Sequence, residues 1–140
     1  MKDLRILVVE ADATIGSLIA EMLEDLGAVV CGVEVDITKA ASAVERCHPD
    51  LMIVDVGLGM ANGVTAIKEI LLAGLIPCVF VTDDNLREPS DWPGAILIRK
   101  PFRGPEIEAA IRRAMHESRQ DAVDASSRAR GEPPDSATGN

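Results

Sequence analysis

Short apolar runs separated by longer segments of helical periodicity make up most of this chain. The runs and the polar residues that follow them are 6–9 with Glu10, 51–54 with Asp55, 78–81 with Thr82, and 95–98 with Arg99 and Lys100. Nearly continuous β-branched runs are typical of strands that are buried on both faces of a parallel sheet. Ligands and chemistry collect at the carboxyl edge of such a sheet, so we predict that these polar residues converge there.

The segments between the runs have apolar residues at three-to-four spacing, which predicts helices. The stripe of the first helix consists of Ile15, Leu18, Ile19, Met22, Leu23 and Leu26. Gly27 is placed to end it, and a second strand follows over 28–33. Further helices are predicted over about 38–47, 63–73 and 105–119. Alternating strands and helices with right-handed crossovers predict a doubly wound α/β fold, with five parallel strands and helices on both faces.

Two segments depart from this alternation. Residues 83–94 contain Pro89 and Pro93 and no apolar stripe, so we expect a shortened fourth helix there. Residues 121–140 show no periodicity, so we expect one folded domain of strands and helices over 1–120 and a disordered C-terminal tail over 121–140. No effector domain is expected from those last twenty residues.

Composition excludes several classes of protein. The net charge of −9 argues against nucleic acid and anionic membrane surfaces as partners. No apolar segment has the length of a signal peptide core or a membrane span, so a cytoplasmic location is expected. Three cysteines without a CxxC pair favour reduced, buried thiols. Because aromatic residues make up only 2% of the chain, the core must be aliphatic.

Four motifs in order resemble the receiver domain of bacterial two-component response regulators over about residues 1–120. The motifs are Ile6-Leu7-Val8-Val9-Glu10, the segment from Pro49 through Asp55 to Leu58 with Gly63 after it, Phe80-Val81-Thr82, and Lys100-Pro101-Phe102. The resemblance implies a flavodoxin-like sheet with strand order 2-1-3-4-5. It also implies a cis peptide bond between Lys100 and Pro101.

The resemblance assigns a role to each polar residue at the strand ends. Asp55 would accept a phosphoryl group from a histidine kinase or a histidine phosphotransfer protein. Lys100 would supply fixed positive charge, and Thr82 would donate a hydrogen bond to a phosphoryl oxygen. A magnesium ion, Mg²⁺, would bind oxygen ligands from an acidic pair after the first strand, from Asp55 and from the backbone carbonyl of Gly57.

The acidic pair departs from the family pattern. Positions 10 and 11 should both be acidic, but the chain has Glu10 followed by Ala11, and an acid returns only at Asp12. Glu10, one methylene longer than aspartate, is a candidate metal ligand. Asp12 is either a metal ligand or the N-cap of the first helix, and both alternatives stay open. The loss of an oxygen ligand at Ala11 predicts weak magnesium binding.

Two functional hypotheses follow. The first is a single-domain response regulator, not an enzyme with an effector domain, that signals from Asp55 by altered protein–protein binding. The second is a pseudo-receiver, which binds proteins without being phosphorylated. Ala11 and Asp83 favour the second, because one removes a metal ligand and the other opposes a phosphoryl group. Leu97 replaces the aromatic residue that many receivers have on the fifth strand.

Overall fold

A five-stranded parallel sheet forms the centre of the molecule in the computed structural model, which describes residues 1–36, 39–55, 76–82 and 96–129. The strands are β1 (Arg5–Val9), β2 (Val29–Glu34), β3 (Leu51–Asp55), β4 (Cys78–Thr82) and β5 (Ile96–Arg99). Their order is β2-β1-β3-β4-β5, and every pairing is parallel. This order confirms the predicted strand arrangement. The predicted helices over 63–73 and in 83–94 lie outside the described residues.

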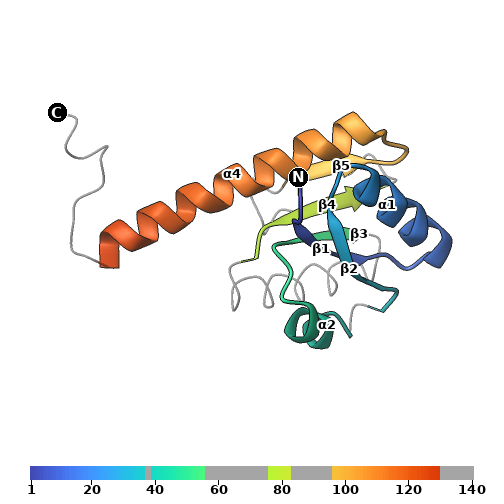
Figure 1. Ribbon diagram of the computed structural model, residues 1–140, viewed down its shortest axis with the longest axis horizontal. Coiled ribbons are helices and arrows are strands. Elements are labelled where there is room, and N and C mark those ends of the chain that lie inside the picture. The colour runs from blue at the N-terminus through green and yellow to red at the C-terminus, as the bar shows by residue number, and fades with distance from the viewer. Residues whose placement is uncertain (37–38, 56–75, 83–95, 130–140) are drawn as a thin grey trace.

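Helices cover both faces of the sheet, as predicted (Figure 1). Helices α1 (Ala13–Asp25) and α4 (Gly104–Ala129) lie on one face, and α2 (Ala40–Cys47) lies on the other. The first face buries a cluster that includes Ile19 and Leu23 from α1 and Ile107 and Ile111 from α4. The second buries strand residues under α2. Phe80 is the one aromatic residue among the buried members of the two clusters, in keeping with the low aromatic content.

One residue of the predicted α1 stripe does not face the core. Ile19 and Leu23 are buried, whereas Leu18 is 55% exposed. At about 100° per residue, Leu18 falls at the margin of the stripe centred on Ile15, Ile19, Met22 and Leu26. The inward placement of Leu18 was therefore wrong, because a helix on a sheet buries only the middle of such a stripe.

Helix α4 continues to Ala129, past the predicted end near Arg119, and projects beyond the sheet (Figure 1). The prediction of disorder is therefore wrong for residues 121–129. This segment has no glycine or proline, and Ala122, Ala125 and Ala129 are strong helix formers. A segment without an apolar stripe has no face to bury against the sheet, but its helix propensity still allows it to be helical. The remaining residues, 130–140, lie outside the described part of the chain.

The three cysteines are free thiols, and Cys47 is buried as expected, whereas Cys31 and Cys78 are half-buried. Burial, followed by the contact with Cys47, raises the pKa of Cys31 to about 12. Burial also raises the pKa of Cys78 above its ordinary range. Protonated thiols are poor nucleophiles, which agrees with a packing role for Cys31 and Cys78.

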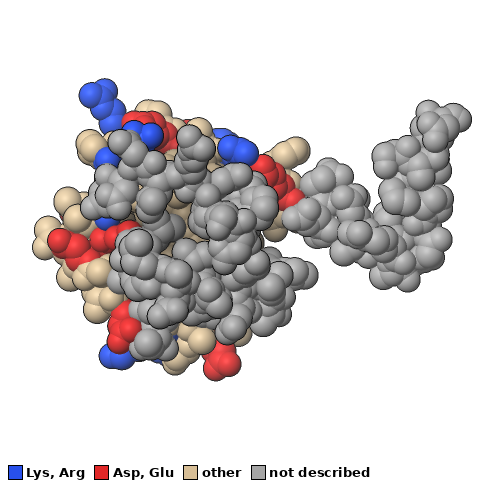
Figure 2. Space-filling model, turned by 180° about the vertical axis from the view of Figure 1, so that it is seen from behind, with Lys and Arg blue, Asp and Glu red and all other residues tan. Residues whose placement is uncertain are grey.

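The surface combines both charges. On the face seen in Figure 2, described acidic and basic side chains are interspersed around the rim. Helix α4 shows the same mixture, with Arg112 paired to Glu108 and Arg113 paired to Glu117. None of the described helices is both long enough and apolar enough to cross a bilayer.

The start of α1 generates a prediction about Asp12. Its Oδ1 accepts hydrogen bonds from the backbone N–H groups of Thr14 at 2.9 Å and Ile15 at 3.1 Å. Asp12→Ala removes this N-cap and should lower the free energy of unfolding by about 1 kcal/mol. Asp12→Asn retains an acceptor oxygen and should lose only a few tenths of that amount. Urea denaturation of the two variants measures the difference, and equal losses would contradict the capping role.

Candidate functional site

Four polar residues predicted from the strand ends meet at the carboxyl edge of the sheet. Glu10 directly follows β1, Asp55 ends β3, Thr82 ends β4 and Lys100 directly follows β5. The backbone N–H of Lys100 donates to the carbonyl oxygen of Thr82 at 2.6 Å, so the end of β5 is tied to the end of β4. Parallel pairing in this order brings the four residues together.

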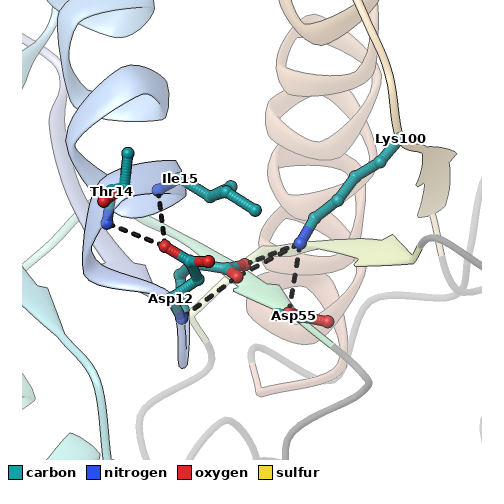
Figure 3. A network of polar contacts seen from close by, with 6 residues as sticks. Asp12, Thr14, Ile15, Asp55 and Lys100 are labelled. Atoms are coloured by element: carbon teal, nitrogen blue, oxygen red, sulfur yellow. Dashed lines mark hydrogen bonds and ion pairs between the residues drawn. The ribbon is translucent and has the colours of Figure 1, made fainter.

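The side chain of Lys100 joins the two acids of this edge (Figure 3). Its Nζ lies 3.1 Å from Oε1 and 3.1 Å from Oε2 of Glu10. The same nitrogen lies 3.2 Å from Oδ2 of Asp55. All three side chains are largely shielded from solvent, with exposed fractions of 16% for Lys100, 3% for Glu10 and 13% for Asp55. We call Glu10, Asp55 and Lys100 the acid–lysine cluster.

Burial shifts the pKa values of Glu10 and Lys100 in opposite directions, but the neighbouring groups leave both pKa values raised. Burial, followed by the neighbouring Asp55 carboxylate, raises the pKa of Glu10, and Lys100 only partly offsets the rise. Burial alone would lower the pKa of Lys100, but its hydrogen bonds and charge interactions with Glu10 and Asp55 raise it overall. Because the pKa of Lys100 is raised above the ordinary lysine value of 10.5, its stabilising contribution is complete well below that value and is lost as the pH rises through the higher pKa of the folded protein. Lys100 is therefore charged at neutral pH.

Asp12 does not face Lys100. Its carboxylate caps α1, and its backbone N–H lies 3.4 Å from Oε1 of Glu10. Ala11 is exposed and has no side-chain oxygen. The capping alternative for Asp12 is thus the one seen here, because a single short carboxylate that accepts two amide hydrogens at a helix start is directed toward that helix.

The predicted magnesium ligands are only partly assembled. Glu10 and Asp55 are adjacent, Asp12 is engaged with α1, and Gly57 lies outside the described residues. In the described ranges, no group of three or more histidine, cysteine, aspartate or glutamate side chains could hold a metal ion. The oxygens that face the pocket contact an ammonium group instead. Among the described residues, Glu10 and Asp55 are therefore the predicted side-chain ligands that lie together.

The remaining predicted features are distributed around the cluster. Thr82 is buried, with 2% of its surface exposed, and Leu97 is half-buried on β5. The peptide bond between Lys100 and Pro101 is cis, as the resemblance implies. Asp83 lies outside the described residues.

Gly16 is a contributor that the sequence pattern did not single out. A Cβ on this residue of α1 would lie 2.9 Å from Cγ1 of Val33 and 3.6 Å from Cβ of Glu10. The absence of a side chain lets the first turn of α1 approach β2 and cover the stem of Glu10. A glycine inside an apolar helical stripe is the signal that could have pointed to this close approach.

Comparisons with known proteins agree with this geometry. The model of the response regulator receiver domain matches residues 6–112. Protein CcdB of Bacillus subtilis (strain 168) is 28% identical over 116 residues, which cover 79% of this chain and 97% of that protein. The transcriptional regulatory protein PdtaR of Mycobacterium tuberculosis (strain ATCC 25618 / H37Rv) is 30% identical over 120 residues. That alignment covers 83% of this chain but only 58% of PdtaR.

Solved structures show the same fold. The receiver domain of PhyR from Erythrobacter litoralis superposes with a TM-score of 0.70 at 25% identity, covering 83% of this chain and 92% of that chain. The response regulator PhyR from Brucella abortus gives a TM-score of 0.72 at 27% identity, covering 88% of this chain and 52% of that chain. The family model matches most of the folded chain, and the strand order and the residues at the strand ends agree with that match. The chain therefore belongs to the response regulator receiver domain family.

Proposed function

We propose that the chain is a receiver that accepts a phosphoryl group on Asp55 from a histidine kinase or a histidine phosphotransfer protein. The observation that supports this most directly is the contact of 3.2 Å between Oδ2 of Asp55 and Nζ of Lys100 at the carboxyl edge. A nucleophilic carboxylate next to a fixed cation is the arrangement that phosphoryl transfer requires. The chain then signals through altered binding to a downstream protein.

The chemical step is a displacement at phosphorus. A carboxylate oxygen of Asp55 forms the new P–O bond while the bond from phosphorus to the donor breaks and the donor keeps the electron pair. Lys100 stabilises negative charge on the phosphoryl oxygens, and the hydroxyl of Thr82 donates a hydrogen bond to one of them. Asp55 is thus a phosphoacceptor that assists its own phosphorylation and dephosphorylation, not an enzyme acting on other substrates.

Magnesium is proposed to bind only weakly at the acidic pocket of this chain. Receiver domains bind Mg²⁺ at the acidic pocket, where the bound ion adds positive charge beside the phosphoryl oxygens. In this chain Glu10 and Asp55 are the side chains available to hold it, since Ala11 has no ligand atom and Asp12 caps α1. Two carboxylates already in contact with Lys100 favour weak binding.

A second candidate function is the pseudo-receiver, a protein-binding module that is not phosphorylated. Two observations favour it: Ala11 in place of an acid, and the engagement of Lys100 by both carboxylates of the pocket. Both candidates act through protein partners in the cytoplasm, with neither nucleic acid nor a membrane as a ligand. They differ in whether Asp55 gains a phosphoryl group.

Incubation with acetyl phosphate and magnesium tests the first candidate. The wild-type protein should gain the mass of one phosphoryl group, and Asp55→Asn should gain none, because the amide is not a nucleophile for this reaction. Asp50→Asn is the matched control, since Asp50 precedes the same strand at its opposite end and accepts the N–H of Arg5. Intact-mass spectrometry measures the gain. A wild-type protein that gains no mass would support the pseudo-receiver, and a gain retained in Asp55→Asn would exclude Asp55 as the acceptor.

Restoring the acid at position 11 tests the proposal of weak metal binding. Ala11→Asp adds an oxygen ligand, so Mg²⁺ should bind about tenfold tighter and phosphorylation should be faster. Ala13→Asp adds the same charge two residues further along and should change Mg²⁺ binding much less. Isothermal titration calorimetry measures both affinities. Equal affinity in the wild type and Ala11→Asp would show that the missing ligand does not limit binding.

A further inference from the structure

We propose that Cys31 and Cys47 form a thiol pair that a peroxide oxidises to an intramolecular disulfide, which joins the edge strand β2 to helix α2 covalently. Both residues belong to the apolar cluster beneath α2. The polar residues proposed to carry the phosphoryl chemistry lie instead at the carboxyl edge of the sheet. This modification site therefore goes beyond the proposed function and does not depend on it.

The two thiols lie against each other in this cluster. Sγ of Cys47 donates a hydrogen bond to the carbonyl oxygen of Cys31 at 3.0 Å, and Sγ of Cys31 donates to the carbonyl oxygen of Ile6 at 3.5 Å. The thiols also contact each other directly, and this contact is one cause of the raised pKa of Cys31. Because the sulfurs are already in contact, rotation about the Cα–Cβ bonds can bring them to the separation of about 2.0 Å that a disulfide requires.

Two irregularities of β2 explain why the strand approaches Cys47 so closely. The pairing of β1 with β2 shifts between Ile6 and Leu7, so Cys31 is the extra residue of a β-bulge. A bulge re-aims the side chain at the extra position. Gly32 follows, and a Cβ there would lie 3.2 Å from Cδ1 of Leu7 and 3.4 Å from Sγ of Cys47. A larger residue at position 32 would crowd the sulfur, so the bulge and the glycine together favour the contact.

Polar contacts hold α2 against the strands on which the pair depends. The guanidinium group of Arg5 donates to the carbonyl oxygen of Cys47, at 3.0 Å from Nε and 2.7 Å from Nη2. Nη2 of Arg46 lies 3.0 Å from Oε1 of Glu34. The first contact ties the last residue of α2 to β1, and the second ties α2 to the end of β2. Two reacting groups held in proximity by a fixed backbone react far more readily than free ones.

Exposure decides which sulfur reacts first. Cys31 is half-buried and Cys47 is buried, so a small peroxide reaches Cys31. Burial and the contact with Cys47 raise the pKa of Cys31, and the positive charge of Arg5 only partly offsets the rise. Because the thiolate is the reactive form, the first step is slow at neutral pH. The pair therefore stays reduced in the resting protein and is oxidised only on sustained exposure to peroxide.

The chemistry takes place in two displacements at oxygen and sulfur. The Cys31 thiolate attacks one oxygen of the peroxide, the O–O bond breaks, and the departing hydroxide takes up a proton to become water. The product at Cys31 is a sulfenic acid. The sulfur of Cys47 then attacks the sulfenic sulfur, the S–O bond breaks, and the leaving hydroxide takes the proton of Cys47. Two thiols lose two electrons in total, and one hydrogen peroxide is reduced to two waters.

Thiol counting in the folded wild-type protein tests the inference. The reduced protein is incubated with hydrogen peroxide, unfolded in the presence of N-ethylmaleimide and measured by mass spectrometry. We expect one alkylated cysteine in place of three, and a cross-link between the peptides that contain Cys31 and Cys47. Dithiothreitol should restore all three alkylation sites. Three alkylated cysteines after prolonged exposure, or oxygen added at Cys31 without a cross-link, would overturn the inference.

Two cysteine variants identify the sulfurs involved. Cys47→Ala removes the second sulfur and should form no intramolecular cross-link. Cys78→Ala is the matched control, because Cys78 is a half-buried thiol of β4 that packs against the same cluster, and this variant should form the cross-link as the wild type does. If Cys47→Ala does not fold, the peptide map of the wild type decides alone, and a cross-link through Cys78 would contradict the assignment. Asp55→Asn should oxidise like the wild type, which separates this outcome from phosphorylation.

Discussion

The ammonium group of Lys100 is the interaction on which the functional edge of this protein depends. It lies between two carboxylates that would otherwise face each other in a shielded pocket, and it contacts oxygens of both. Without a cation there, the burial of Glu10 beside Asp55 would be unfavourable, as the raised pKa of Glu10 indicates. The same ammonium is the group that a phosphoryl oxygen on Asp55 would need. One side chain thus stabilises the resting pocket and is proposed to take part in its chemistry.

The sheet makes this arrangement possible because it brings four strand ends to one edge. Parallel neighbours β1, β3, β4 and β5 end at the same level, and each is followed or terminated by one polar residue of the site. The buried aliphatic clusters on both faces hold the strands in register. A rigid scaffold of this kind positions side chains far more accurately than loops do.

The two acids after β1 have different tasks in this chain. Glu10 is buried and faces Lys100, whereas Asp12 is exposed and caps α1. Ala11 between them contributes no oxygen. A receiver with acids at both positions 10 and 11 would direct more negative charge into the pocket. A bound metal ion would neutralise that charge. Here Ala11 adds no further charge, and a single lysine contacts both carboxylates and neutralises one of their two negative charges.

The order of apolar runs and helical stripes was sufficient to predict the parallel sheet, the helix-covered faces and the convergence of Glu10, Asp55, Thr82 and Lys100, because periodicity and strand ends are local properties of a sequence. The tertiary structure decided three further points. It directed Asp12 to α1, since a capping bond depends on where the helix begins. It extended α4 to Ala129, since helix propensity persists where no packing stripe is present. It placed both oxygens of Glu10 on Lys100, 90 residues away in sequence, and only the pairing of the strands brings those residues within reach.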